Sequence, residues 1–150
     1  MTNEEKELLL KDLTARLPYG VIVEYGCKHE GKDLGERKSK LTGRMIDSFF
    51  GSMQIGMSEV YSLQPYLRPM SSMTEDEKLH IVDLEFKIER RDNFYIAYYD
   101  FLNSIHIDYR GLISKGLAIK APEKMYKEYR LPPLGSNWWE MYNSINLKNE

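Results

Sequence analysis

His106 and Asp108, two residues apart, are the side chains best suited to acid–base chemistry in this sequence. No nucleophile motif accompanies them, because Cys27 and Ser114 lie in no recognised elbow and no third catalytic group is near in sequence. Asp108 is also well placed to cap a helix that follows it, while His106 packs or faces solvent. This structural role is the preferred interpretation, and we expect the protein not to be an enzyme.

Metal and cofactor sites are not expected from the sequence. The three histidines are scattered without the short spacing of metal ligands, and a single cysteine excludes an internal disulfide framework. Neither G-x-x-x-x-G-K-[ST] nor G-x-G-x-x-G occurs, so no phosphate-binding loop is indicated. We therefore expect no cofactor and no bound metal.

The segment Asp108-Tyr109-Arg110-Gly111 carries two residue types that commonly anchor protein interfaces, tyrosine and arginine. Tyr109 and Arg110 are therefore candidates for binding a partner. In the alternative, structural interpretation, Asp108 caps a helix, Tyr109 packs against an aromatic helix, Arg110 pairs with a carboxylate and Gly111 permits close approach. The sequence leaves both interpretations open.

Tyr66 and Arg68 form a second candidate pair. Pro65 and Pro69 favour an extended backbone between them, in which alternate side chains point to opposite faces. If Leu67 belongs to the core, Tyr66 and Arg68 point outward together. They then form either the rim of a barrel or part of a binding surface.

A basic cluster suggests a different partner, nucleic acid. Its members are Arg37, Lys38, Lys40 and Arg44. Neighbouring aromatic residues could stack on bases, as in single-strand binding grooves. However, acidic residues interrupt the preceding loop, and the formal net charge of the chain is −2. A solvated face is the preferred interpretation, and nucleic-acid binding is the alternative.

The composition favours one domain without a membrane span. The chain has 150 residues and is 42% hydrophobic, enough for a packed core. Its longest run without a formal charge covers the 11 residues 48–58, far below the roughly 20 apolar residues that a spanning helix needs. We expect a cytoplasmic protein and a single cooperative domain.

The N-terminal element that would position these residues is a helix, within residues 1–18. Thr2 and Glu5 have the spacing of a capping box, and leucines recur every four residues at Leu9, Leu13 and Leu17. We expect this leucine stripe to be buried.

Residues 19–70 have the composition of a small antiparallel β-barrel. The predicted strands cover residues 19–26, 40–46, 49–55 and 59–62, with a last extended piece at 66–68 and an exposed loop at 27–38. An SH3-like barrel is preferred, and an OB-like barrel is the close alternative.

Residues 71–150 form a mainly helical half with one possible added strand. Thr74 and Glu77 make a second capping box, but residues 82–89 alternate apolar and polar, so we expect a short helix followed by a strand. A helix over residues 94–105, a short one at 108–113 and an extended piece at 117–120 follow. Trp138, Trp139 and Tyr142 belong to a last helix, which staples the C-terminal segment or contacts a second copy. The fold class is α+β.

Three blocks of the chain resemble a known family. They are residues 8–21 (LLLKDLTARLPYGV), residues 64–74 (QPYLRPMSSMT), and residues 108–113 with 115–118 (DYRGLI and KGLA). They are similar, in the same order, to a family of small uncharacterised proteins from gut bacteria and their phages. The resemblance implies a bacterial, phage or mobile-element origin and carries no activity.

The preferred function is therefore a non-enzymatic module that binds another protein, in a phage or mobile-element setting. The alternative is a small β-barrel protein that binds nucleic acid.

Overall fold

A capped helix begins the chain. The computed structural model describes residues 1–51 and 58–126, and helix α1 spans Asn3–Arg16. The Thr2 hydroxyl accepts from the Glu5 N–H at 3.1 Å, and the Glu5 carboxylate accepts from the Thr2 N–H at 2.7 Å, which completes the predicted capping box. Leu9 and Leu13 are fully buried, as predicted, whereas Leu17 lies in a 3-10 turn, Leu17–Tyr19, and is half-buried.

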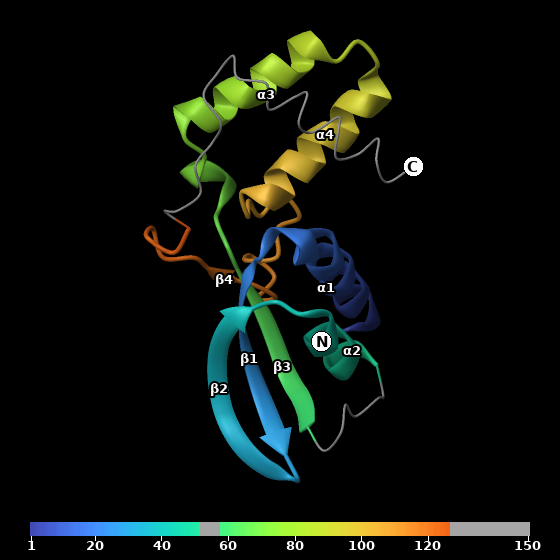
Figure 1. Cartoon of the computed structure of the whole chain (residues 1–150), viewed down its shortest axis with the longest axis vertical. Coiled ribbons are helices and arrows are strands. Elements are labelled where there is room, and N and C mark those ends of the chain that lie inside the picture. Colours follow the sequence, from blue (N-terminus) through green and yellow to red (C-terminus); the bar gives the residue numbers. More distant parts are fainter. Residues whose placement is uncertain (52–57, 127–150) are drawn as a thin grey trace.

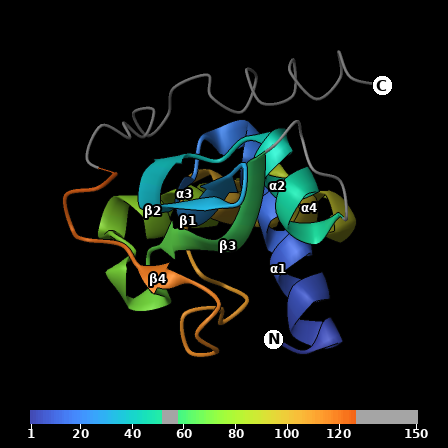
Figure 2. The same ribbon diagram turned by 90° about the horizontal axis from the view of Figure 1, so that it is seen from below.

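A curled, four-stranded half-barrel sheet packs against α1 (Figure 1). Its strands are β1 (Ile22–His29), β2 (Lys32–Lys40), β3 (Ser58–Leu67) and β4 (Ile119–Lys120), in the order β2-β1-β3-β4. β1 is antiparallel to both β2 and β3, whereas β4 runs parallel to β3. Alternate residues of β1 and β3 face α1, and Figure 2 shows α1 and α2 on the same side of the sheet.

The prediction of an exposed loop over residues 27–38 is wrong. β1 continues to His29, and Glu30 and Gly31, with φ angles of 51° and 76°, form a two-residue turn into β2. β2 is an edge strand, and its residues are exposed or half-exposed on both faces. A strand without a buried face needs no apolar alternation, and charged residues suit an unpaired edge.

The two strands predicted over residues 40–46 and 49–55 are also wrong where they are described. Helix α2, Gly43–Phe50, occupies this segment, and the Thr42 hydroxyl accepts from the Met45 N–H at its start. Its half-buried apolar residues follow helical spacing and contact the main core: Met45, Ile46, Phe49 and Phe50. Residues 52–55 lie outside the described part. Residues 59–62 and 66–67, predicted as extended, belong to β3.

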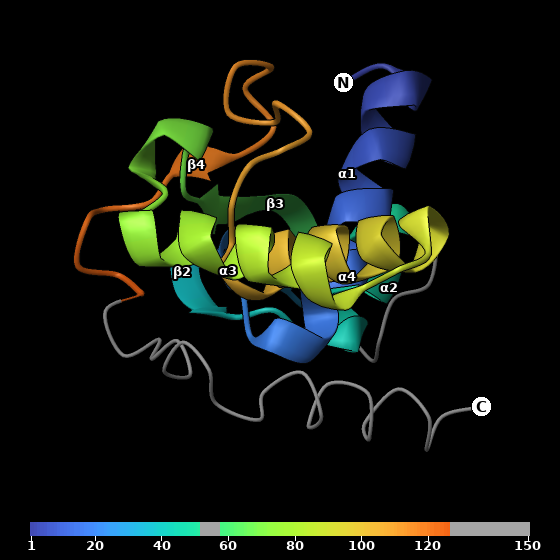
Figure 3. The ribbon, with the colours of Figure 1, turned by 90° about the horizontal axis from the view of Figure 1, so that it is seen from above.

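Two further helices form a hairpin at the end of the molecule (Figures 1 and 3). Helix α3 spans Glu75–Lys87 and has the predicted capping box at Thr74 and Glu77; helix α4 spans Arg91–Ser104. The strand predicted over residues 82–89 is therefore wrong, whereas the helix predicted over 94–105 is confirmed. No helix among residues 1–51 and 58–126 has the length and apolar character needed to cross a bilayer.

The chain after α4 returns to the sheet. The helix predicted over residues 108–113 is replaced by successive turns, which the Asp108 carboxylate caps by accepting from the N–H groups of Leu112 (2.8 Å) and Ile113 (2.9 Å). β4 then falls within the predicted extended piece, residues 117–120. Residues 138, 139 and 142, and the last predicted helix, lie outside the described residues.

Two apolar clusters result, and backbone hydrogen bonds are among the contacts that join them. One lies between α1 and the sheet, and the other between α3 and α4. At the end of β3, the Arg68 N–H donates to the His106 carbonyl, and the Asp108 N–H donates to the Arg68 carbonyl, both at 2.8 Å. Segments from the two clusters therefore meet along residues 105–110.

We predict that Leu13→Ala lowers the free energy of unfolding by about 2–5 kcal/mol, because it removes a fully buried leucine. Leu10 is the matched control, since it lies on the same helix and is 37% exposed; Leu10→Ala should cost about 1 kcal/mol or less. Urea unfolding followed by circular dichroism measures both. Equal losses for the two variants would contradict the packing described for α1.

Candidate functional site

Tyr66, a predicted partner-binding residue, lies inside the structure. It is 4% exposed; its hydroxyl donates to Glu24 Oε1 at 2.9 Å, and the Lys38 ammonium lies 4.9 Å from its ring centroid. Tyr66 lies on the outer face of the sheet, as expected if Leu67 belongs to the core, but it is not exposed there. The Lys38 side chain lies over its ring, and β4 pairs with β3 beside it.

Arg68 is engaged in an internal ion pair. Its Nη2 donates to Glu77 Oε1 at 2.8 Å and its Nη1 donates to Glu77 Oε2 at 3.1 Å, in a bidentate arrangement. The guanidinium also donates to the carbonyl oxygens of Ile105 and Ser72. Glu77, in the first turn of α3, is 4% exposed. Arg68 therefore fixes the start of α3 on the end of β3.

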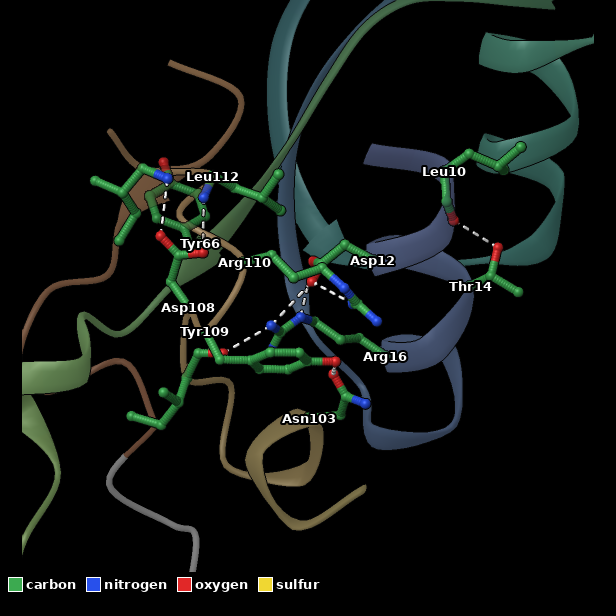
Figure 4. A network of polar contacts seen from close by, with 12 residues as sticks. Leu10, Asp12, Thr14, Arg16, Tyr66, Asn103, Asp108, Tyr109, Arg110 and Leu112 are labelled. Atoms are coloured by element: carbon green, nitrogen blue, oxygen red, sulfur yellow. Dashed lines mark hydrogen bonds and ion pairs between the residues drawn. The ribbon is translucent and has the colours of Figure 1, made fainter. Parts of the chain in front are cut away.

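Arg110, the third candidate, belongs to a buried charge cluster (Figure 4). Asp12 and Arg16, four residues apart on α1, are fully buried and form an ion pair, Arg16 Nε to Asp12 Oδ2 at 2.8 Å. Arg110 Nη1 also donates to Asp12, at 2.9 Å, and Arg16 Nη2 donates to the Ile107 carbonyl at 2.7 Å. One carboxylate of α1 thus holds two arginines.

Tyr109, the fourth candidate, packs among these arginines. The guanidinium carbons of Arg16 and Arg110 lie 5.6 and 4.6 Å from its ring centroid, within the range of cation–π contacts. Its hydroxyl donates to Asn103 Oδ1 at 3.0 Å, and its ring contacts that of Tyr99 on α4. Burial raises the pKa of Tyr109. Two parts of the structural interpretation agree with these contacts, because Tyr109 packs against α4 and Arg110 pairs with a carboxylate. Asp108 caps turns rather than a helix.

Sequence reasoning missed Asp12 and Arg16, the centre of this cluster. A signal was present, because an i, i+4 pair of opposite charges lies on the same helical face as the buried Leu9 and Leu13. Charged residues on an apolar face require partners from elsewhere in the chain. Here those partners come from about 90 residues away in sequence.

His106 lies beside this cluster and does not act with Asp108. Both Asp108 oxygens accept backbone N–H groups, and no hydrogen bond joins the two side chains among the described residues. The buried His106 ring stacks on Tyr126, with ring centroids 4.0 Å apart. Burial, with the nearby charges of Arg16 and Arg68, lowers the pKa of His106 to about 4, so the imidazole is neutral near pH 7.

Tyr126, the last described residue, stacks on His106 and makes two hydrogen bonds to the backbone of the sheet. Its hydroxyl donates to the Tyr66 carbonyl at 2.8 Å and accepts from the Ile22 N–H at 3.1 Å, and burial raises its pKa to about 12. His106 also has a φ of 62°, a left-handed conformation that few non-glycine residues adopt. The stack and both hydrogen bonds hold this strained turn between the two clusters.

The basic residues do not form one surface. Lys38 and Lys40 share one face of β2, whereas Arg37 points to the other and Arg44 lies on α2. Lys38 is opposite Glu24 in the β1–β2 register. Its hydrogen bond to the Tyr66 hydroxyl is the main factor that raises the pKa of Lys38. Within the described part, no group of three or more His, Cys, Asp or Glu residues is placed to hold a metal ion.

The outer face of α3 is an apolar surface that the predictions did not include. Leu79, Val82 and Phe86 lie on one side of the helix and are 47%, 44% and 85% exposed. Glu77 and Leu84 are buried on the opposite side. We call the three exposed residues the α3 stripe. In a helix, residues two apart point in nearly opposite directions, so a helix with two apolar faces produces the alternation that predicted a strand.

Comparison of this chain with protein-family models, with curated proteins and with solved structures finds no match. The candidate sites therefore depend on the geometry described above.

We predict that Asp12→Ala lowers the free energy of unfolding by about 3–5 kcal/mol, because it leaves Arg16 buried without its carboxylate. The matched control is Asp83→Ala, which breaks an i, i+4 ion pair with Lys87 whose side chains are 27% and 35% exposed. That change should cost about 1 kcal/mol or less. If urea unfolding gives equal losses, the buried cluster does not hold the fold.

We predict that His106 makes the protein less stable as the pH falls from 7 to 5. Its pKa is about 4 in the folded protein and near 6.5 in the unfolded chain, so the unfolded state binds the proton first. The contribution of neutral His106 to the free energy of unfolding is fully present above about pH 6.5. It falls by about 2 kcal/mol between pH 7 and pH 5, and it is lost as the pH falls through about 4.

His106→Asn removes the titrating group and tolerates the left-handed backbone. Urea unfolding of both proteins at pH 7 and pH 5 isolates the contribution of His106 from those of the other groups. An equal loss in the variant and the natural protein would show that His106 takes no part.

Proposed function

We propose that this protein is a non-enzymatic interaction module, and that a helix of a partner protein packs along the α3 stripe. The observation that carries the proposal is the exposure of Phe86, a large aromatic side chain of which 85% remains in contact with solvent. Single exposed apolar residues are common, but the stripe places three at helical spacing opposite the buried face of the same helix. That arrangement suits a helix with apolar residues on both sides.

The way α3 is held supports this proposal. A hydrogen-bonded ion pair with Arg68 fixes Glu77 in the first turn, and Leu84 and Ile88 belong to the apolar cluster shared with α4. The helix is therefore presented in a fixed orientation, which reduces the entropy lost on binding. Figure 3 shows α3 as the outermost layer at its end of the molecule.

The four candidate residues taken from the sequence have a structural role in this proposal. Tyr66, Arg68, Tyr109 and Arg110 are engaged in internal contacts, so a partner could reach them only by displacing bonds that stabilise the fold. We infer that they position α3 and α4 and that the stripe makes the contact.

The half-barrel sheet serves in this proposal as the scaffold. We infer that it is an open relative of the SH3-like or OB-like barrel predicted from the sequence, with irregular pairing around Gly26 and Cys27 that strengthens the curl. The cytoplasmic location and the phage or mobile-element setting stay predictions.

Nucleic-acid binding is the second candidate, favoured by one observation. On the outer face of the sheet, the ammonium groups of Lys28 and Lys38 lie over the rings of Tyr61 and Tyr66, at 5.4 and 4.9 Å. Stacking on bases requires an accessible ring, however, and Tyr66 is buried beneath Lys38. The interaction module is therefore the better-supported function.

The proposal predicts that Phe86→Glu abolishes partner binding. Affinity capture with the tagged full-length chain, from cells that naturally express it, should retain a protein that the variant loses by at least about thirty-fold, the usual effect at an interface hot spot. Ile96→Glu on α4 is the control, because Ile96 is 64% exposed and lies off the stripe. Capture that Phe86→Glu leaves unchanged, with both variants folded by circular dichroism, would contradict the proposal.

A further inference from the structure

The α3 stripe is compatible with a symmetric contact. Its three residues occupy positions i, i+3 and i+7, with Val82 close to the middle. When two copies of α3 lie antiparallel with Val82 opposite the partner subunit's Val82, Leu79 faces the partner subunit's Phe86. The same pairing repeats on the other side of the two-fold axis, as an isologous interface requires.

The charges beside the stripe match this antiparallel alignment. Lys78 and Glu85 border one side of the stripe, and the alignment brings Lys78 close to the partner subunit's Glu85. On the other side, Asp76 approaches the partner subunit's Lys87 in the same way. Each of these pairs occurs twice in a symmetric dimer, so the borders supply four attractive contacts. Lys78 and Lys87 share these contacts with Glu75 and Asp83 of their own helix.

One like-charge contact opposes the alignment. Asp83 lies near the two-fold axis and approaches the partner subunit's Asp83. Each Asp83 is already ion-paired with Lys87 of its own helix at 2.9 Å, which reduces the repulsion. The two ends of α3 favour antiparallel packing, since Glu75 and Asp76 lie in its first turn and Lys87 in its last turn.

We propose that the occupant of the α3 stripe is the α3 helix of a second copy of this chain, packed antiparallel about a two-fold axis. This inference rests on the proposed function and names the partner that it requires. Helix α3 has 13 residues and is about 20 Å long, so the contact falls below the standard interface of about 1,200–2,000 Å². The dimer is accordingly weak and forms as the protein concentration rises.

Charge reversal tests the inference on the full chain by sedimentation equilibrium across a range of concentrations. Lys78→Glu alone and Glu85→Lys alone each place like charges across the interface and should weaken the dimer at least about ten-fold. Mixing the two variants restores both attractive pairs in a mixed dimer, because each chain supplies the charge that the other has lost. A parallel alignment does not give this rescue.

The expected result is a dimer in the natural protein, loss of it in Phe86→Glu and in each charge variant, and recovery in the mixture. A chain that stays monomeric at every concentration overturns the inference of a dimer. The proposed function is then tested separately, by whether affinity capture retains a different protein. A dimer that Phe86→Glu leaves intact also overturns it and places the contact elsewhere. A dimer lost in Phe86→Glu but not restored by mixing overturns the antiparallel alignment.

Discussion

The buried ion pair of Asp12 and Arg16 connects helix α1 to the chain that follows α4. Removing two charges from water costs several kcal/mol each, and the cost is offset only when their hydrogen-bonding groups find partners. Asp12 takes a second arginine, Arg110, and Arg16 reaches the Ile107 carbonyl. The buried charges of helix α1 are therefore satisfied by the chain after α4, although the two segments are about 90 residues apart in sequence.

A second ion pair, between Arg68 and Glu77, connects the same region to helix α3 at the surface. Arg68 follows β3 directly, is bound through its backbone to residues 106 and 108, and pairs with Glu77 at the start of α3. The positions of α1, the sheet and α3 are thus linked through residues 105–110. In consequence the apolar stripe of α3 is held outward on a rigid base, and the tyrosine and arginine side chains that suggested a binding surface are used inside the protein.

Features that depend on local sequence could be predicted, and features that depend on distant partners could not. The capping box at Thr2 and Glu5 and the spacing of the leucines determine α1 without reference to the rest of the chain. β2 could not be predicted, because an edge strand with two exposed faces does not alternate apolar and polar residues. The sequence predicts a short helix and a strand where the structure has the single helix α3, because apolar residues on both faces of a helix alternate with polar ones as in a strand. The roles of Arg68 and Arg110 depended on carboxylates elsewhere in the sequence, which residue type alone does not reveal.

Native-state hydrogen exchange in increasing denaturant tests whether the buried charge cluster joins the two apolar clusters into one cooperative unit. We expect the slowest amides of α4 and those of β1 and β3 to exchange with the same free energy, equal to that of global unfolding. Exchange of the α3 and α4 amides through a separate opening of lower free energy, while the sheet stayed protected, would show two independent units.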